Sequence, residues 1–322
     1  MVVTTPRFSS VLRVVQSAVA RASGAVVVLL VLSTLVFLAL RLLPGDPAAL
    51  VLGDRASAED RALLRARLGL DDPLPVQYAR FLWGLVRGDV GPSLARPGVS
   101  AFGAVADAMG PTAALAGTAV LLGATGGIVA AVLCVGPWLG ARREWVHRAI
   151  LVASATPLIA LAPLLTFALA VKWRLVPLPG DPESGALGLL FASALLAVPL
   201  GAQVGRISRA SLMEVASSKF LQVAAAKGAS SWRVWLIHGL PPASGPISVV
   251  IAAQLGALLG GAVVLERLFE RPGLGTLMLN AYAARDLPVL EASVIAAGLL
   301  FVAAQALAGA VHALVDPRGK AA

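Results

Sequence analysis

Long apolar runs separated by shorter polar stretches dominate the chain. The runs cover approximately residues 24–43, 111–139, 149–171, 185–204, 244–265 and 288–313. Each is about 20 residues or more, the length an α-helix needs to cross the hydrocarbon core of a bilayer. The runs lack the alternation of membrane β-barrels, so helices remain as the way to satisfy the backbone in lipid. The pattern predicts an all-α, polytopic membrane protein with six transmembrane helices in a single domain, residues 1–322.

Composition agrees with this class. The chain is 58% hydrophobic and 13% charged, with a mean hydropathy of +0.85, whereas a soluble domain is about half apolar and a quarter charged. The net charge of +9 could suit a nucleic acid, but the positive charges lie beside the apolar runs, so no nucleic-acid partner is expected. Cys134 is the single cysteine, and in an apolar run it reads as a buried, inert thiol.

The basic residues also predict an orientation. The first run follows a basic tail, is too long for a signal-peptide core and has no cleavage site, so it reads as a retained helix. Arginine and lysine favour the cytoplasmic side of short loops. Their distribution predicts a multi-pass protein of the plasma (inner) membrane with both termini in the cytoplasm. It places residues 206–242 in the cytoplasm and residues 44–109 outside.

The segment 44–109 is predicted to hold two helices. Ser57 and Asp60 form a capping pair for a helix that Gly69 closes. Pro73 and Pro75 open a second helix, and five of its apolar residues share one face at helical spacing. These residues are Tyr78, Phe81, Leu82, Leu85 and Val86. We expect this second helix to lie on the membrane surface or to pack on the bundle.

The segment 206–242 is the long polar stretch of the second half. Ser217 or Ser218 can cap a short, alanine-rich helix, and Gly228 is a left-handed stop for it. The next serine pair can cap a second short helix that ends before Pro241. Helix, glycine turn and helix make a compact knob beside the membrane.

Within the runs, glycines recur four residues apart, which permits close helix contact. The pairs are Gly123 with Gly127, Gly201 with Gly205, and Gly256 with Gly260. Four prolines are expected to kink their helices: Pro137, Pro157, Pro163 and Pro199.

Several kinds of chemistry are absent from the sequence. There is no phosphate-binding loop, no zinc-protease or serine-hydrolase motif, and the three histidines are scattered. We therefore expect no catalytic, cofactor or metal site in this chain, and no enzyme activity. Charged residues are almost missing from the centres of the runs, which disfavours an ion-coupled carrier. The other rival class is a membrane scaffold or enzyme, and the missing catalytic residues disfavour it.

The polar segment 206–242 resembles the cytoplasmic "EAA" loop of binding-protein-dependent ABC importer permeases. With the family's glycine aligned on Gly228, Leu240-Pro241 falls on its Leu-Pro. Gln222 and Val223 replace the Glu and the first Ala, and His238 replaces the Ile. These departures resemble the peptide/nickel branch, with which Phe220, Leu221, Ala224, Ala226, Lys227 and Gly228 agree. The alternative is an amphipathic connector without a coupling role.

Other segments resemble the same branch in the same order along the chain. They are Leu42-Leu-Pro-Gly-Asp-Pro47, Leu68-Gly-Leu-Asp-Asp-Pro-Leu-Pro-Val-Gln-Tyr78, Gly88-Asp-Val-Gly-Pro-Ser-Leu94, Arg271-Pro-Gly-Leu-Gly275, Ala284-Arg-Asp-Leu-Pro288 and Leu314-Val-Asp-Pro-Arg318. Together they resemble the B-type permease subunit of dipeptide, oligopeptide or nickel importers, with a type I ABC importer fold.

The resemblance implies partners and a role for the loop. It implies a second, C-type permease as heterodimer partner, two cytoplasmic ATPase subunits that carry ATP and magnesium, and an extracytoplasmic solute-binding protein. It implies import of di- or oligopeptides by alternating access, with nickel or a nickel chelate as the alternative. The residues it assigns to ATPase coupling are Phe220, Leu221, Gln222, Ala224, Ala225, Ala226, Lys227, Gly228, Leu240 and Pro241.

Overall fold

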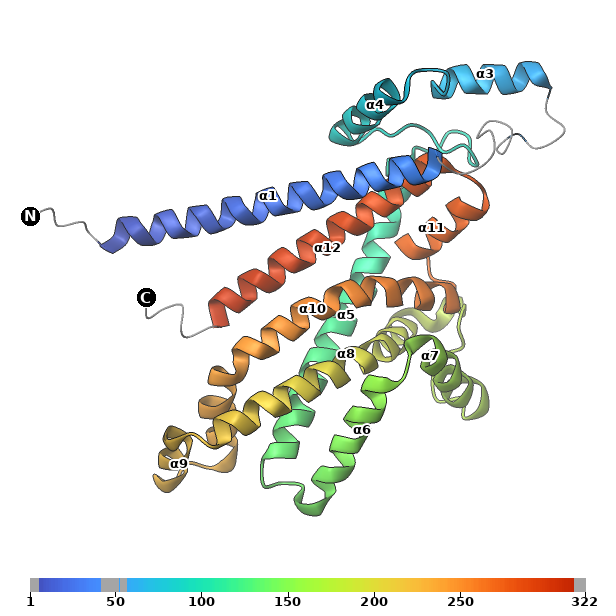
Figure 1. Cartoon of the computed structure of the whole chain (residues 1–322). Helices are drawn as coiled ribbons and strands as arrows, with labels where there is room; N and C mark the ends of the chain where they lie inside the picture. Colours follow the sequence, from blue (N-terminus) through green and yellow to red (C-terminus); the bar gives the residue numbers. More distant parts are fainter. Residues whose placement is uncertain (1–5, 42–51, 53–56, 316–322) are drawn as a thin grey trace, which may run out of the picture. The chain divides into compact units, whose positions relative to one another are not determined.

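The computed structural model describes residues 6–41, 52 and 57–315, and most of these residues are helical (Figure 1). The motif Leu42–Pro47 and the end of the motif Leu314–Arg318 lie outside the described residues. The described part contains no β-strand, only an isolated antiparallel bridge between Pro92 and Ser100. The chain divides into two compact units, Met1–Asp107 with Leu277–Val302 (unit 1) and Ala108–Thr276 with Ala303–Ala322 (unit 2).

Each predicted apolar run corresponds to helical structure. The helices that contain the runs are α1 (Pro6–Arg41), α5 (Ala101–Val135), α6 (Arg143–Ala155) with α7 (Leu158–Thr166), α8 (Gly185–Ala216), α10 (Leu240–Leu268) and α12 (Leu287–Val315). In the described residues, α5, α8, α10 and α12 are long and apolar enough to span a membrane. The bent pair α6 and α7 would make a fifth span, and the apolar part of α1, Ser23–Ala39, is shorter. The all-helical membrane fold is confirmed, and the count of six spans stays a prediction.

The polar segment of unit 1 folds as its local signals predict. Helix α3 (Ala58–Leu68) begins after Ser57, whose hydroxyl accepts the backbone N–H of Asp60, and left-handed Gly69 closes it. Helix α4 (Leu74–Arg87) begins after Pro73. The predicted apolar face of α4 packs inward except at Val86, and Phe81 joins Phe37 of α1 and Ile295 of α12 in one buried cluster.

In unit 2, helix α8 packs against both α10 and α6 (Figure 1). Glycines allow α8 to approach α5 closely: a Cβ at Gly127 would meet backbone atoms of Gly201 and Gly205. This confirms close packing at two of the three predicted glycine pairs. A Cβ at Gly260, of the third predicted pair, would meet no other atom within 4 Å.

The prolines act differently from one another. Pro157 lies in the break between α6 and α7, where the chain bends by 112°, because a proline removes a hydrogen bond and restricts the residue before it. Pro163 and Pro199 lie inside helices. Pro137 does not kink a helix as predicted, because α5 has already ended at Val135 and Pro137 belongs to the following turn.

Candidate coupling site

The first half of the predicted knob is helix α9 (Lys219–Ala226), which contacts α8 and the π-helix η4 (Arg233–Gly239). Ser218 occupies the N-cap position, but its hydroxyl donates to the Val215 carbonyl and makes no cap hydrogen bond. The end of α9 matches the prediction. Gly228 has φ +81°, its N–H donates to the Ala225 carbonyl, and the Ala229 N–H donates to the Ala224 carbonyl. This is the Schellman arrangement, in which glycine adopts a left-handed conformation without a Cβ clash.

The second half of the knob differs from the prediction. The second helix does not end before Pro241. From Ser231 the chain is helical through η4 and continues into α10. The Leu240 N–H donates to the carbonyl of Trp235, five residues back, and this wider turn precedes Pro241, which has no N–H to give. Leu240 and Pro241 therefore lie in the first turn of a long helix, beyond the knob itself.

The ten predicted coupling residues differ in how exposed they are to solvent. Leu221 is buried and Ala224 is half-buried, so these two face α8 and η4. Leu240 is half-buried in the first turn of α10. The others are exposed: Phe220, Gln222, Ala225, Ala226, Lys227, Gly228 and Pro241. With Val223, which is also exposed, Phe220 gives α9 an unpartnered apolar surface.

Two stacked aromatic rings hold the knob, a contact that no sequence pattern predicted. Trp232 at the start of the second helix stacks on Trp138, with ring centroids 4.2 Å apart and an interplanar angle of 25°. Trp138 belongs to the turn after α5. A cavity of about 360 Å³ lies beside the knob, lined by Phe220, Glu214, Ser218 and the proline-rich start of α10.

A second polar group in unit 2 organises the loop after α10. Glu266, in the last turn of α10, is 1% exposed. Its carboxylate accepts the Thr112 hydroxyl (2.5 Å) and the backbone N–H groups of Gly275 (2.7 Å) and Thr276 (3.1 Å). A Cβ at Gly273 would collide with this carboxylate, and one at Gly275 would collide with Val263. The Pro-Gly-Leu-Gly motif is therefore the backbone that wraps around Glu266.

Unit 1 contains an equivalent arrangement. Asp286 is 2% exposed. It accepts a hydrogen bond from the Ser93 hydroxyl and bonds from the backbone N–H groups of Leu94 (3.0 Å) and Ala95 (3.3 Å). The motifs around Ser93 and Asp286 thus meet across 193 positions of sequence.

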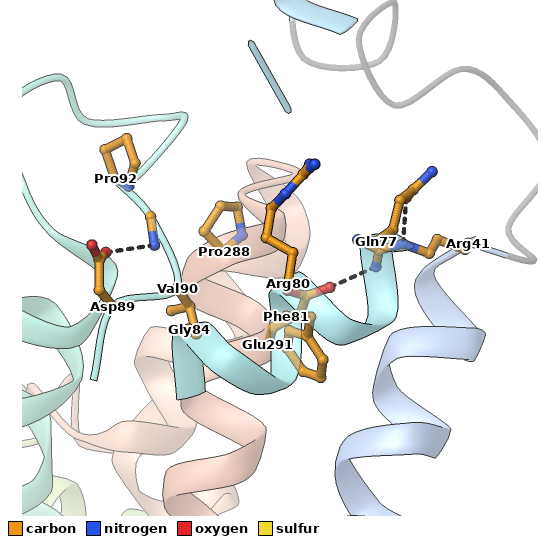
Figure 2. Close-up of a pocket in the computed structure, with 11 residues that line it drawn as sticks. Arg41, Gln77, Arg80, Phe81, Gly84, Asp89, Val90, Pro92, Pro288 and Glu291 are labelled. Carbon is orange, nitrogen blue, oxygen red and sulfur yellow. Dashed lines mark hydrogen bonds and ion pairs between the residues drawn. The ribbon is translucent and has the colours of Figure 1, made fainter. Parts of the chain in front are cut away.

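Arg41 forms the third polar group, at the end of α1 (Figure 2). Its guanidinium pairs with Glu291 of α12 (2.9 Å), donates to the Gln77 side chain (3.1 Å) and lies 3.8 Å from the Phe37 ring centroid. The Gln77 amide also donates to carbonyls of the turn before α4, those of Leu70 and Asp72. A cavity of about 310 Å³ opens here, lined also by Arg80 and Asp89.

These sites position helices and loops and carry no catalytic arrangement. The part of the chain that the structure describes holds no cluster of three metal-binding side chains. Sequence reasoning found the knob from its glycine and Leu-Pro spacing. It missed Trp138, Glu266 and Asp286 as organising residues, although both acids flank apolar runs, where an unpaired carboxylate would be costly.

The helices and the knob define a class, the multi-pass membrane protein with a transporter permease fold. A chain from the structure of the MetNI methionine ABC transporter in inward-facing conformations has the same fold. The TM-score is 0.50 at 16% identity, over 73% of this chain and 98% of that chain.

The chain belongs to the family of binding-protein-dependent transport system inner membrane components. The family model matches residues 109–320, and the model of the family's N-terminal part matches residues 14–105. A glutathione transport system permease protein of Salmonella paratyphi A is 35% identical, over 92% of this chain and 96% of the relative. A protein of Sinorhizobium fredii named a probable peptide ABC transporter permease is 32% identical, over 92% of this chain and 97% of the relative. The chain is thus a multi-pass membrane subunit that works with other subunits.

Proposed function

We propose that this chain is the B-type permease subunit of an ATP-driven, solute-binding-protein-dependent importer of peptides. It forms half of the translocation pathway together with a C-type permease. Two cytoplasmic ATPase subunits bind ATP and magnesium, and an extracytoplasmic solute-binding protein delivers the substrate. The single observation that carries the proposal is the match with permease relatives over 92% of this chain and 96–97% of theirs.

The shape of the knob supports a coupling role. Helix α9 exposes Phe220 (49%) and Val223 (51%), and a polar stretch beside a membrane gains nothing from exposed apolar side chains unless a partner covers them. Because η4 joins the knob to α10 without a break, a displacement of the knob is transmitted to a membrane-spanning helix. The rigid-body switch of an alternating-access transporter requires such a connection.

Peptides are favoured over nickel chelates as substrate. The relatives described above are named for peptide and glutathione transport, and glutathione is itself a small peptide.

The test is Gly228→Asp in the complex of the permease pair with its ATPases. A Cβ at Gly228 would meet no atom within 4 Å, so the variant costs only the left-handed strain of about 1–2 kcal/mol and adds a charge to the docking surface. We expect normal membrane insertion, loss of ATPase co-purification and loss of peptide uptake.

Gly98→Asp is the matched control. Gly98 has φ +83°, against +81° at Gly228, and it also faces open space, but it lies in the segment assigned to the opposite side of the membrane. The control should keep docking and uptake. Normal docking and uptake in Gly228→Asp would reduce the loop to a connector and contradict its coupling role.

The orientation that this function needs is tested separately. Ser57 and Ser217 are both exposed. Cysteine at Ser57 should react with an impermeant thiol reagent in intact cells, and cysteine at Ser217 only after lysis. The reverse pattern would place the knob outside and exclude ATPase coupling.

A further inference from the structure

Helix α4 has a second apolar face that no other part of the described chain covers. Its inner face contributes Phe81 to the cluster with Phe37. On the opposite side Val76, Trp83 and Val86 are 46%, 57% and 79% exposed. With Ala79, Arg80 and Arg87, which are also exposed, they follow the spacing of one helix face. We call this set the outer face of α4.

The contacts of α4 fix its depth along α1. The Tyr78 hydroxyl is 2.6 Å from the Thr34 hydroxyl, and Gln77 accepts from Arg41 (3.1 Å). Thr34 and Arg41 are seven residues apart, about 10 Å along the helix axis. The apolar part of α1 ends at Ala39, within this interval. With α1 as the first of the six predicted spans, helix α4 lies where α1 leaves the hydrocarbon core.

The direction of α4 fits the same position. Figure 2 shows α4 running across the end of α1 toward α12, instead of alongside α1. A helix that crosses the end of a membrane-spanning helix runs along the bilayer surface. Its outer face is then at the level of the lipid headgroups, a layer only a few ångströms thick on each side of the core.

The side chains of the outer face suit lipid. The Arg87 guanidinium lies over the Trp83 ring, 4.5 Å from its centroid. Helix α4 contains no acidic residue, and both of its charges are arginines of the outer face. Tryptophan prefers the membrane interface, and arginine buries its stem while its charge reaches a phosphate.

Neighbouring helix α3 shows what a water-facing helix looks like in the same segment. It carries Glu59 and Asp60 in its first turn, and its Arg65 pairs with Asp71. It has no aromatic residue. The mixed charge of α3 and the purely basic, aromatic outer face of α4 therefore indicate different surroundings.

We propose that the outer face of α4 binds the membrane surface: Val76, Trp83 and Val86 enter the boundary between headgroups and acyl chains, and Arg87 binds phosphates of anionic phospholipids. Arg80 pairs with Asp72 of the preceding turn (2.5 Å) and lines the cavity that also contains Arg41, so it is not one of the proposed lipid contacts. This interface is independent of which solute is transported. It holds in place the helix whose Gln77 contacts Arg41.

The test uses the full chain reconstituted in lipid bilayers, alone and with its partner subunits. Cys134 is the only cysteine, so Cys134→Ala gives a background for single nitroxide labels at Val86→Cys and, as control, at Leu63→Cys. Leu63 is 55% exposed on α3. Collisions are measured with oxygen, which dissolves in lipid, and with a water-soluble nickel chelate.

We expect the ratio of oxygen to chelate collisions to be several-fold higher at position 86 than at position 63, with and without partners. Equal chelate access at the two positions would overturn the proposal. Protection of position 86 from both probes only when partner subunits are present would assign the face to a protein, and would also overturn it.

A second variant tests the charges without removing the apolar contact. In vesicles containing phosphatidylglycerol, Arg87→Gln should reduce the oxygen-to-chelate ratio at position 86, and in purely zwitterionic vesicles it should change the ratio little. Arg65→Gln on α3 is the control and should change neither. An equal loss in both lipids, or no loss in either, would exclude phosphate binding by Arg87.

Discussion

Two kinds of contact hold the loops of this protein. Buried carboxylates hold the loops at Glu266 and Asp286, whereas apolar contacts hold the knob around α9. At each buried carboxylate, one hydroxyl and two backbone N–H groups donate. All three donors on Asp286 come from a distant segment, whereas on Glu266 only the Thr112 hydroxyl is distant and the N–H groups belong to the following loop. In the described residues 219–239, no side chain makes a hydrogen bond to another side chain, and Leu221 and the Trp138–Trp232 stack hold the knob. A buried carboxylate fixes one loop geometry, because its donors would otherwise be unpaired. Apolar contacts leave the knob's outer surface free for a partner.

The largest effect is expected for Glu266→Gln. The new amide N–H₂ must face groups that donate hydrogen bonds, so at least one buried donor loses its acceptor at a cost of about 1–3 kcal/mol. With three donors on this carboxylate, we expect about 3 kcal/mol of lost stability. Thermal unfolding in detergent measures it. Glu270→Gln, an exposed position on the same loop, should leave the unfolding temperature unchanged, and equal behaviour of the two variants would break the comparison.

Asp286→Asn should cost less, about 2 kcal/mol, because one of its backbone bonds is long at 3.3 Å. The variant should release the backbone N–H groups of Leu94 and Ala95, which donate to Asp286. Amide hydrogens of this segment should therefore exchange with solvent faster than in the parent protein. Asp71→Asn, which removes only a surface ion pair with Arg65, is the control, since such pairs contribute about 0–1 kcal/mol. An unchanged exchange rate in Asp286→Asn would mean that Asp286 does not restrain the segment.

Trp232→Ala tests the apolar contacts that hold the knob. It removes the stack on Trp138, worth about 0.5–1.5 kcal/mol beyond the lost burial, and leaves the exposed residues of α9 in place. We expect a small loss of stability and a clear loss of coupling between ATP hydrolysis and uptake in the assembled transporter. Trp145→Ala is the control, because Trp145 is 71% exposed. If both variants transport normally, the stack does not position the knob.

The smallest effect on stability is expected for Phe220→Ala. The side chain is 49% exposed, so the permease alone should unfold within about 0.5 kcal/mol of the parent. The affinity for the ATPase subunits should nevertheless fall, because an exposed aromatic is the kind of side chain that dominates interfaces. A pull-down titration measures it. Unchanged affinity would show that α9 docks by another surface.

Local signals predicted much of this fold. Features that depend only on residues a few positions apart could be predicted: the cap at Ser57, the helix ends at Gly69 and Gly228, and the apolar runs. The π-turn before Pro241 was missed, because the proline pair reads as a helix end until the wider turn is seen. The hydrogen bonds to the buried carboxylates were missed for a different reason. Glu266 finds its hydroxyl partner 154 positions away, and no spacing rule connects the two residues.

The sequence predicted the position of the candidate site but not the contacts that hold it in place. Gly228 and the Leu240-Pro241 pair gave the position of the knob, while the inward turn of Leu221 depends on how α9 rests on α8 and η4. The Trp138–Trp232 contact joins two segments that are adjacent only in the folded unit. Coupling by these residues stays a prediction.

The π-turn in η4 has a consequence for how motion travels. A π-turn holds surplus residues relative to an α-turn, and each residue of an α-helix advances the side chains by about 100° around the axis. Rewinding the π-turn by one residue would thus rotate the whole of α10 by about 100° relative to the knob, without unfolding either. In the coupling role proposed above, the turn between Arg233 and Gly239 would determine which side chains of α10 face α8. A partner that presses on α9 would then rotate α10 as well as tilt it.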